Sequence, residues 1–96
     1  MKPYRRKLSR EDAETGTLLI AKSRWRRFPA PMTEFAVEAG GRRFATRIVA
    51  EDCSCLPPPH QHYHLEAGHF RHLLNFNAGT VIEIEQAGDA YVVRNG

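Results

Sequence analysis

Long hydrophobic runs are missing from this sequence of 96 residues. Uninterrupted apolar runs reach only four residues, as in Leu18–Ala21, whereas a membrane-spanning helix needs about 20. No apolar stretch directly follows the basic residues at the start of the chain, so we expect no signal peptide. A chain of this length suffices for one domain with one modest core. We therefore expect a single domain that does not enter a membrane.

Cysteine is also scarce, because the chain holds only Cys53 and Cys55. A disulfide between two cysteines separated by one residue would close a very small, strained ring. The sequence therefore does not resemble a secreted disulfide scaffold, and we expect a reducing compartment, the cytoplasm.

Catalytic motifs are missing as well. The chain has no glycine-rich loop that could cradle a phosphate and no nucleophile with a recognisable orienting motif. Glu83 and Glu85 share one face of a predicted strand, a pattern more typical of a solvated surface than of a catalytic pair. We therefore expect a protein that is not an enzyme.

Positive charge is abundant and unevenly distributed. Residues 1–47 hold 12 of the 14 Lys and Arg side chains against five acidic ones, a net charge of +7. Residues 48–96 hold two basic and six acidic side chains, a net charge of −4. Eleven of the 14 basic residues are arginine, which pairs with phosphates and guanine edges. The pattern predicts one basic surface, which would be either simply solvated or used to bind nucleic acid.

Hydropathy patterning predicts a mainly β protein, a small barrel with one or two short helices. Residues 1–15 are expected to form a basic, flexible arm, and residues 16–96 a single barrel-like domain. Paired glycines, Gly40 and Gly41, predict a hairpin turn. The apolar stripe of Phe70, Leu73 and Leu74 predicts a helix. The predicted strands are residues 17–23, 34–39, 42–50, 60–65, 80–85 and 90–94, the predicted helix is 67–76, and residues 51–59 are expected to be a loop.

The second half resembles the B-three domains of plant transcription factors in the order and spacing of its motifs. The matching motifs are Tyr63-His64-Leu65, Gly68-His69-Phe70, Leu73-Leu74, Ala78-Gly79-Thr80-Val81 and Gly88-Asp89-Ala90-Tyr91. Two positions depart from the family pattern, because Thr80 stands where the family usually has Asp and His69 where it usually has Trp. The strand that begins at Thr17 resembles the family's first strand, and the basic segment Arg24–Pro31 follows it.

This resemblance implies an open barrel of about seven strands that binds the major groove of duplex DNA with two arms. A similar pseudobarrel serves as the DNA-recognition domain of some restriction endonucleases. The matching arm positions in this chain are Lys22–Arg27 and the segment Arg47–His62. The implied partner is duplex DNA, and no cofactor is implied.

The residue types of these segments agree with nucleic-acid binding, since arginines can hold phosphates and tryptophan can stack on bases. Trp25 could equally belong to the core. Arg43 and Arg47 could instead pair with Glu34 and Glu38 across the hairpin. The predicted nucleic-acid-binding residues are Lys22, Ser23, Arg24, Trp25, Arg26, Arg27, Arg42, Arg43, Arg47, His60 and His62.

A cluster of cysteines and histidines from Cys53 to His72 supports an alternative function, that of a small metal-binding β-barrel protein of a zinc-binding or cupin-like type. Thiolate and imidazole are zinc ligands, although the spacing matches no standard zinc finger. His60, His62 and Glu66 match the first metal motif of cupins, whose second motif is missing. The candidate zinc ligands are Cys53, Cys55, His60, His62 and His64. A third possibility is a protein-interaction module whose basic face meets an acidic partner.

Overall fold

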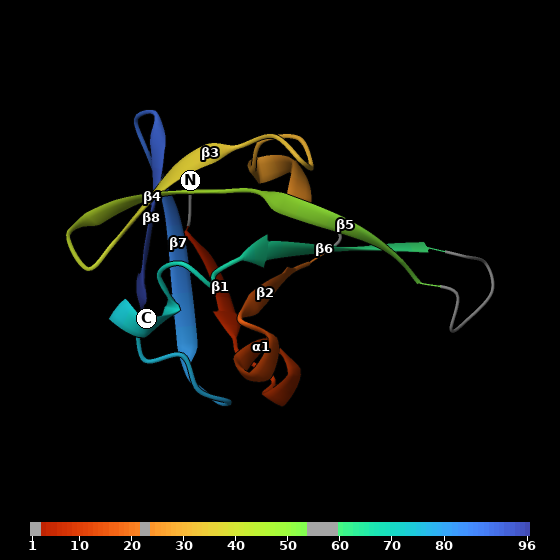
Figure 1. The fold of residues 1–96 in the computed structure, drawn as a ribbon, viewed down its shortest axis with the longest axis horizontal. Coiled ribbons are helices and arrows are strands. Elements are labelled where there is room, and N and C mark those ends of the chain that lie inside the picture. The colour runs from red at the N-terminus through yellow and green to blue at the C-terminus, as the bar shows by residue number, and fades with distance from the viewer. Residues whose placement is uncertain (1–2, 22–23, 54–59) are drawn as a thin grey trace.

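The structure is a computed structural model and describes residues 3–21, 24–53 and 60–96. In this part of the chain, eight strands form two open sheets, shown in Figure 1. The five-stranded sheet consists, in spatial order, of β1 (Tyr4–Lys7), β7 (Val81–Ala87), β8 (Ala90–Asn95), β3 (Phe35–Ala39) and β4 (Arg42–Thr46). The three-stranded sheet consists of β2 (Thr17–Ile20), β6 (His60–Glu66) and β5 (Ile48–Cys53). The predicted mainly β open pseudobarrel is confirmed.

Helical structure within the described ranges is short. It consists of α1 (Arg10–Thr15) and the 3-10 turns η1 (Trp25–Arg27) and η2 (Arg71–Leu73). None of the helices in these ranges has the length and apolar character needed to cross a bilayer.

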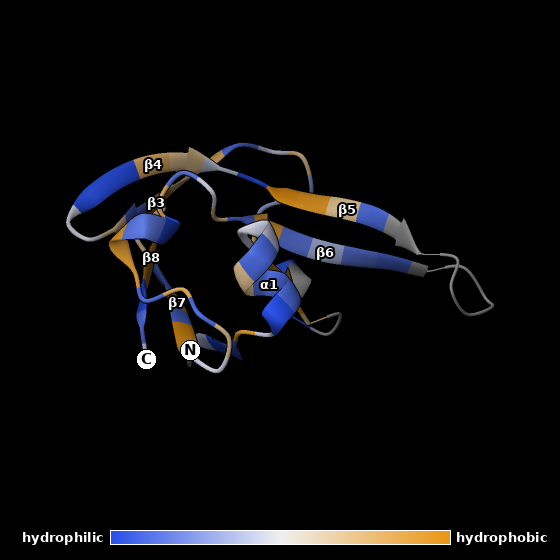
Figure 2. Ribbon diagram, turned by 60° about the horizontal axis from the view of Figure 1, so that its bottom comes forward, coloured by the Kyte–Doolittle hydropathy of each residue, from blue (hydrophilic) through white to orange (hydrophobic). Residues whose placement is uncertain are grey.

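Both sheets contribute one face to a shared core. Leu18 and Ile20 of β2, and Ile82 and Ile84 of β7, are at most 2% exposed, while their neighbours along each strand are more exposed. This is the period-two alternation predicted from the sequence. In Figure 2 the ribbon of β5 is hydrophobic at its start and hydrophilic farther along. At that start buried Ile48 pairs with buried Leu65 of β6.

The predicted hairpin between residues 39 and 42 is present, and its turn depends on glycine. Gly40 and Gly41 both have positive φ angles, +58° and +76°, as a tight two-residue hairpin turn requires. The strand predicted for residues 42–50 is divided at Arg47, where the chain leaves the five-stranded sheet at β4 and enters the three-stranded sheet at β5. The loop predicted for residues 51–59 is wrong at its start, because β5 continues to Cys53, and its remainder lies outside the described residues.

Residues 4–15 differ from the expected flexible arm. Strand β1 pairs antiparallel with β7, and Tyr4 and Leu8 are buried in the core. Ser9 then begins α1 with a capping box, in which the Asp12 amide donates to Ser9 Oγ at 3.1 Å and the Ser9 amide donates to Asp12 Oδ2 at 3.0 Å. The sequence favours this arrangement because Tyr4 and Leu8, four residues apart, fall on the same face of an extended segment just before the cap.

The helix predicted for residues 67–76 is wrong, since only the 3-10 turn η2 forms. A single bond spans four residues, from Arg71 N to Ala67 O at 2.8 Å, and the bonds that follow span three, as from Leu73 N to Phe70 O at 3.0 Å. Leu74 is already extended. Phe70 and Phe76 are both buried. The chain therefore turns sharply to bury two aromatic rings instead of continuing a helix between them.

Candidate nucleic-acid interface

The basic arm that follows β2 folds into a tight turn. The Arg24 amide donates to Ala21 O at 2.8 Å, and the Arg27 amide donates to Arg24 O at 3.0 Å. Arg24 and Arg26 are exposed and Arg27 is half-buried. Trp25 begins η1. The predicted contact residues Lys22 and Ser23 lie outside the described residues, and the side chain of Trp25 is not described.

Two tyrosine hydroxyls hold the two ends of this arm. The Tyr4 hydroxyl donates to Leu19 O and accepts from the Ala21 amide, both at 3.0 Å, where the arm leaves β2. The Tyr91 hydroxyl donates to Arg27 O at 2.9 Å, where the arm ends. Both tyrosines belong to the five-stranded sheet, whereas the arm follows β2 of the three-stranded sheet. The arm is therefore attached to both sheets.

Phe28 fills the space between these two tyrosines. Its ring lies edge-on to Tyr4, with centroids 5.9 Å apart, and stacks on Tyr91 at 5.3 Å. Burial raises the pKa of both tyrosines above its ordinary value. Both hydroxyls therefore remain protonated donors at neutral pH, and the arm has a rigid, apolar base.

A basic pocket opens between β1 and this arm. It has a volume of about 330 Å³, and we call it the arginine pocket. Its lining residues are Pro3, Tyr4, Arg5, Arg6, Ala21, Arg24 and Arg27. The structure thus brings two predicted site residues, Arg24 and Arg27, together with Arg5 and Arg6, which lie in the segment that the sequence predicts to be a flexible arm. The signal that could have revealed this strand is the spacing of Tyr4 and Leu8, which places both side chains on one face of an extended segment and Arg5 and Lys7 on the other.

The other predicted arginines lie elsewhere and have local partners. Arg42 lies over the Phe44 ring, 5.8 Å from its centroid. Arg43 forms an ion pair with Asp89 at 3.1 Å, and Arg47 forms one with Glu66 at 2.9 Å. Arg43 does stand opposite Glu38 in the hairpin, as expected, but its guanidinium reaches Asp89 instead.

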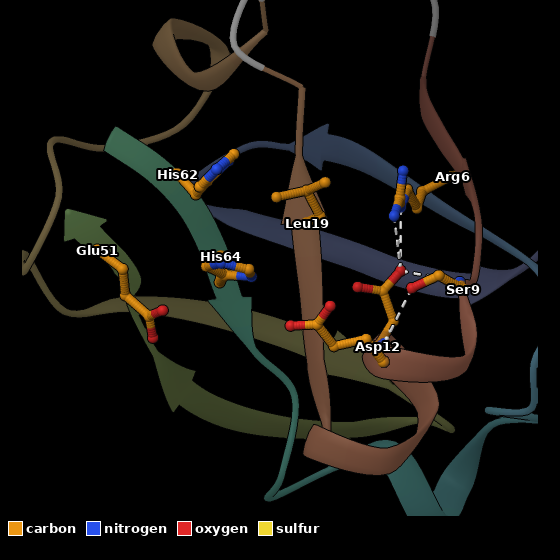
Figure 3. A pocket seen from close by; sticks show the side chains of 8 residues that line it. Arg6, Ser9, Asp12, Leu19, Glu51, His62 and His64 are labelled. Carbon is orange, nitrogen blue, oxygen red and sulfur yellow. Dashed lines mark hydrogen bonds and ion pairs between the residues drawn. The ribbon is translucent and has the colours of Figure 1, made fainter. Parts of the chain in front are cut away.

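The histidines line a second pocket, of about 300 Å³, shown in Figure 3 and called here the histidine pocket. His62 and His64 project from the same face of β6, as the alternation predicts, and Glu51 of β5 is the register partner of His62. Nδ1 of His64 is buried and has no hydrogen-bond partner. On the opposite wall Asp12 is already satisfied by Arg6, at 2.9 Å.

No group of three or more His, Cys, Asp and Glu side chains within the described ranges is arranged to hold a metal ion. Cys55 lies outside these ranges, and the side chains of Cys53 and His60 are not described. The zinc alternative, which needs these residues, therefore stays a prediction.

Comparison with solved structures shows a close likeness in fold. The chain matches the Arabidopsis FUS3–DNA complex with a TM-score of 0.73 and 15% sequence identity, over 99% of this chain and 96% of that chain. FUS3 is a plant B-three-domain transcription factor, so the fold expected from the B-three resemblance is confirmed. No family model matches the sequence, and no curated protein matches it.

Proposed function

We propose that this protein is a duplex-DNA-binding domain and not an enzyme, and that the arm after β2 recognises the major groove. The observation that carries the proposal is the fold. Over almost the whole chain it matches the fold of a protein whose structure was solved in complex with DNA. The second contact region would be the segment Arg47–His62. Such a function requires a compartment that contains DNA, and the closely spaced cysteines fit a reducing one such as the cytoplasm.

The chemistry of the arm supports this function. Arg24 and Arg26 are exposed, and planar guanidinium groups pair bidentately with phosphates and with guanine edges. The backbone that carries them is already folded, and the two tyrosine hydroxyls bond to it on either side, Tyr4 at Ala21 and Tyr91 at Arg27. Less conformational freedom is therefore lost on binding than would be lost by a flexible arm.

The test is a double variant, Arg24→Ala with Arg26→Ala, measured against duplex DNA at several salt concentrations. Exposed charges contribute little to stability, so the variant should fold like the parent. If both arginines contact phosphates, the slope of log affinity against log salt should fall by about 1.8. If one reads a guanine, binding to a selected duplex should weaken by about 1–3 kcal/mol more than binding to a random one.

The control is Lys7→Ala with Arg10→Ala, which removes the same charge. Both residues are exposed and neither lines the arginine pocket. If the two double variants lose equal amounts of affinity for duplex DNA, only the net charge of the protein matters, and the arm assignment is wrong. A parent protein that binds no duplex at low salt would reject DNA binding altogether and leave the acidic protein partner as the alternative.

A further inference from the structure

We propose that the arginine pocket binds one backbone phosphate of DNA, and that Arg5 of β1 is a ligand of this phosphate together with Arg24 and Arg27. This inference rests on the proposed function and extends it to a residue outside both predicted arms. It assigns a phosphate-binding role to the edge strand of the five-stranded sheet.

The charge of the pocket points to an anion. Four of its seven lining residues are arginines and none of the seven is acidic. Arg6 is already neutralised, since its guanidinium donates to Asp12 Oδ2 through Nε at 3.1 Å and Nη2 at 2.9 Å. The excess of basic over acidic side chains in the lining gives the pocket a positive potential, which favours a ligand with negative charge on several oxygen atoms.

Arg5 keeps most of its capacity to bind such a ligand. Its nearest acid is Glu83, at 3.7 Å, which is longer than a hydrogen bond. Glu83 also accepts a hydrogen bond from Arg94 at 2.9 Å, so its charge is shared. The side chain of Arg5 is 61% exposed, and a phosphate can therefore approach it without displacing a buried group.

The two walls of the pocket come from separate but fixed segments. Arg5 is held in register opposite Glu83 by the pairing of β1 with β7. Arg24 and Arg27 belong to the arm whose ends are bonded to Tyr4 and Tyr91. A phosphate held between these walls would be bound by side chains whose backbone is already fixed in place, as expected for a specific contact and not for diffuse attraction.

The test compares Arg5→Ala with Arg10→Ala, an exposed arginine of the same charge that does not line the pocket. Each variant is titrated with a random-sequence duplex at several salt concentrations. Arg5→Ala should weaken binding about two- to fivefold, as expected for one exposed charge contact. It should also lower the salt slope by about 0.9, as the loss of one neutralised phosphate requires. Arg10→Ala should leave the slope unchanged.

Conservative variants separate charge from folding. Arg5→Lys should restore the salt slope because a point charge still neutralises a phosphate, whereas Arg5→Gln, which keeps the stem of the side chain, should behave like Arg5→Ala. Thermal unfolding of each variant checks that β1 remains paired. An unchanged slope in folded Arg5→Gln would overturn the phosphate assignment even if the parent binds DNA.

A second measurement tests the pocket without DNA. Pyrophosphate is titrated into the parent and into Arg5→Gln while the amide resonances of Ala21, Arg24 and Arg27 are followed. Saturable shifts in the parent that are absent in Arg5→Gln support the site, and their absence in the parent overturns it. If the parent binds pyrophosphate here but no duplex, the proposed function fails while the anion site stands.

Discussion

Removing the Tyr91 hydroxyl is the sharpest test of how the basic arm is held. Tyr91→Phe deletes the donor to Arg27 O and keeps the ring, which still stacks on Phe28 and meets Phe35 edge-on at 5.2 Å. The variant therefore changes the attachment of the arm without opening a cavity in the core.

The expected size follows from the single bond that is lost. One neutral hydrogen bond contributes about 1 kcal/mol to stability. For a domain of this size, a loss of about 1 kcal/mol lowers the melting temperature by about 4–8 °C. Freeing the end of the arm also adds a cost of about 1 kcal/mol to DNA binding, because Arg27 must be ordered again in the complex, so affinity should fall about fivefold.

The assay is a double-mutant cycle of Tyr91→Phe with Arg27→Ala, measured both as DNA affinity and as free energy of unfolding in urea. If Tyr91 acts through the position of Arg27, Tyr91→Phe should add almost nothing to the loss of affinity in a protein that already carries Arg27→Ala. The salt slope should not change with Tyr91→Phe alone, because no charge is removed. Tyr63→Phe is the matched control, since its hydroxyl lies 3.4 Å from Gln61 in an exposed position.

Two results would refute this reasoning. If Tyr91→Phe lowers the melting temperature but binds DNA like the parent, the bond stabilises the fold and does not position the arm. If the losses of affinity from Tyr91→Phe and Arg27→Ala are additive, the two residues act independently.

Four further measurements test the rest of the structure. Burial raises the pKa of Tyr4, so its neutral form is favoured in the folded state. The free energy of unfolding should therefore fall as pH rises through about 10 and above, and this fall should be smaller in Tyr4→Phe. Ser9→Ala removes the helix cap and should cost about 1 kcal/mol in urea unfolding, whereas Ser9→Thr should retain most of it. Phe70 is fully buried, so Phe70→Ala should cost about 3–5 kcal/mol; a loss below about 1 kcal/mol would place it outside the core. The purified protein should hold no stoichiometric zinc and should melt at the same temperature with a chelator, while chelator-induced unfolding would favour the metal alternative that uses His62.

The sequence by itself determined the features that depend on short-range periodicity and local geometry. Alternation in Thr17–Ile20 and Val81–Ala87 correctly separated buried from exposed residues, because successive strand residues point to opposite faces. Gly40-Gly41 fixed the hairpin, since two consecutive positive φ angles strongly favour glycine. Ser9 and Asp12 formed a cap within four residues of chain.

Tertiary structure alone decided which distant residues meet. The apolar stripe at Phe70 satisfies helical spacing, yet burial of both Phe70 and Phe76 outweighed the weak preference for a short helix. Guanidinium groups on long side chains choose partners by proximity in space, so Arg43 reached Asp89, 46 residues away, instead of its hairpin neighbour. The pairing of β1 with β7 likewise places Arg5 in the lining of one pocket with Arg24. The sequence could not give this, because a strand's partner is set by packing against the core and not by its own four residues.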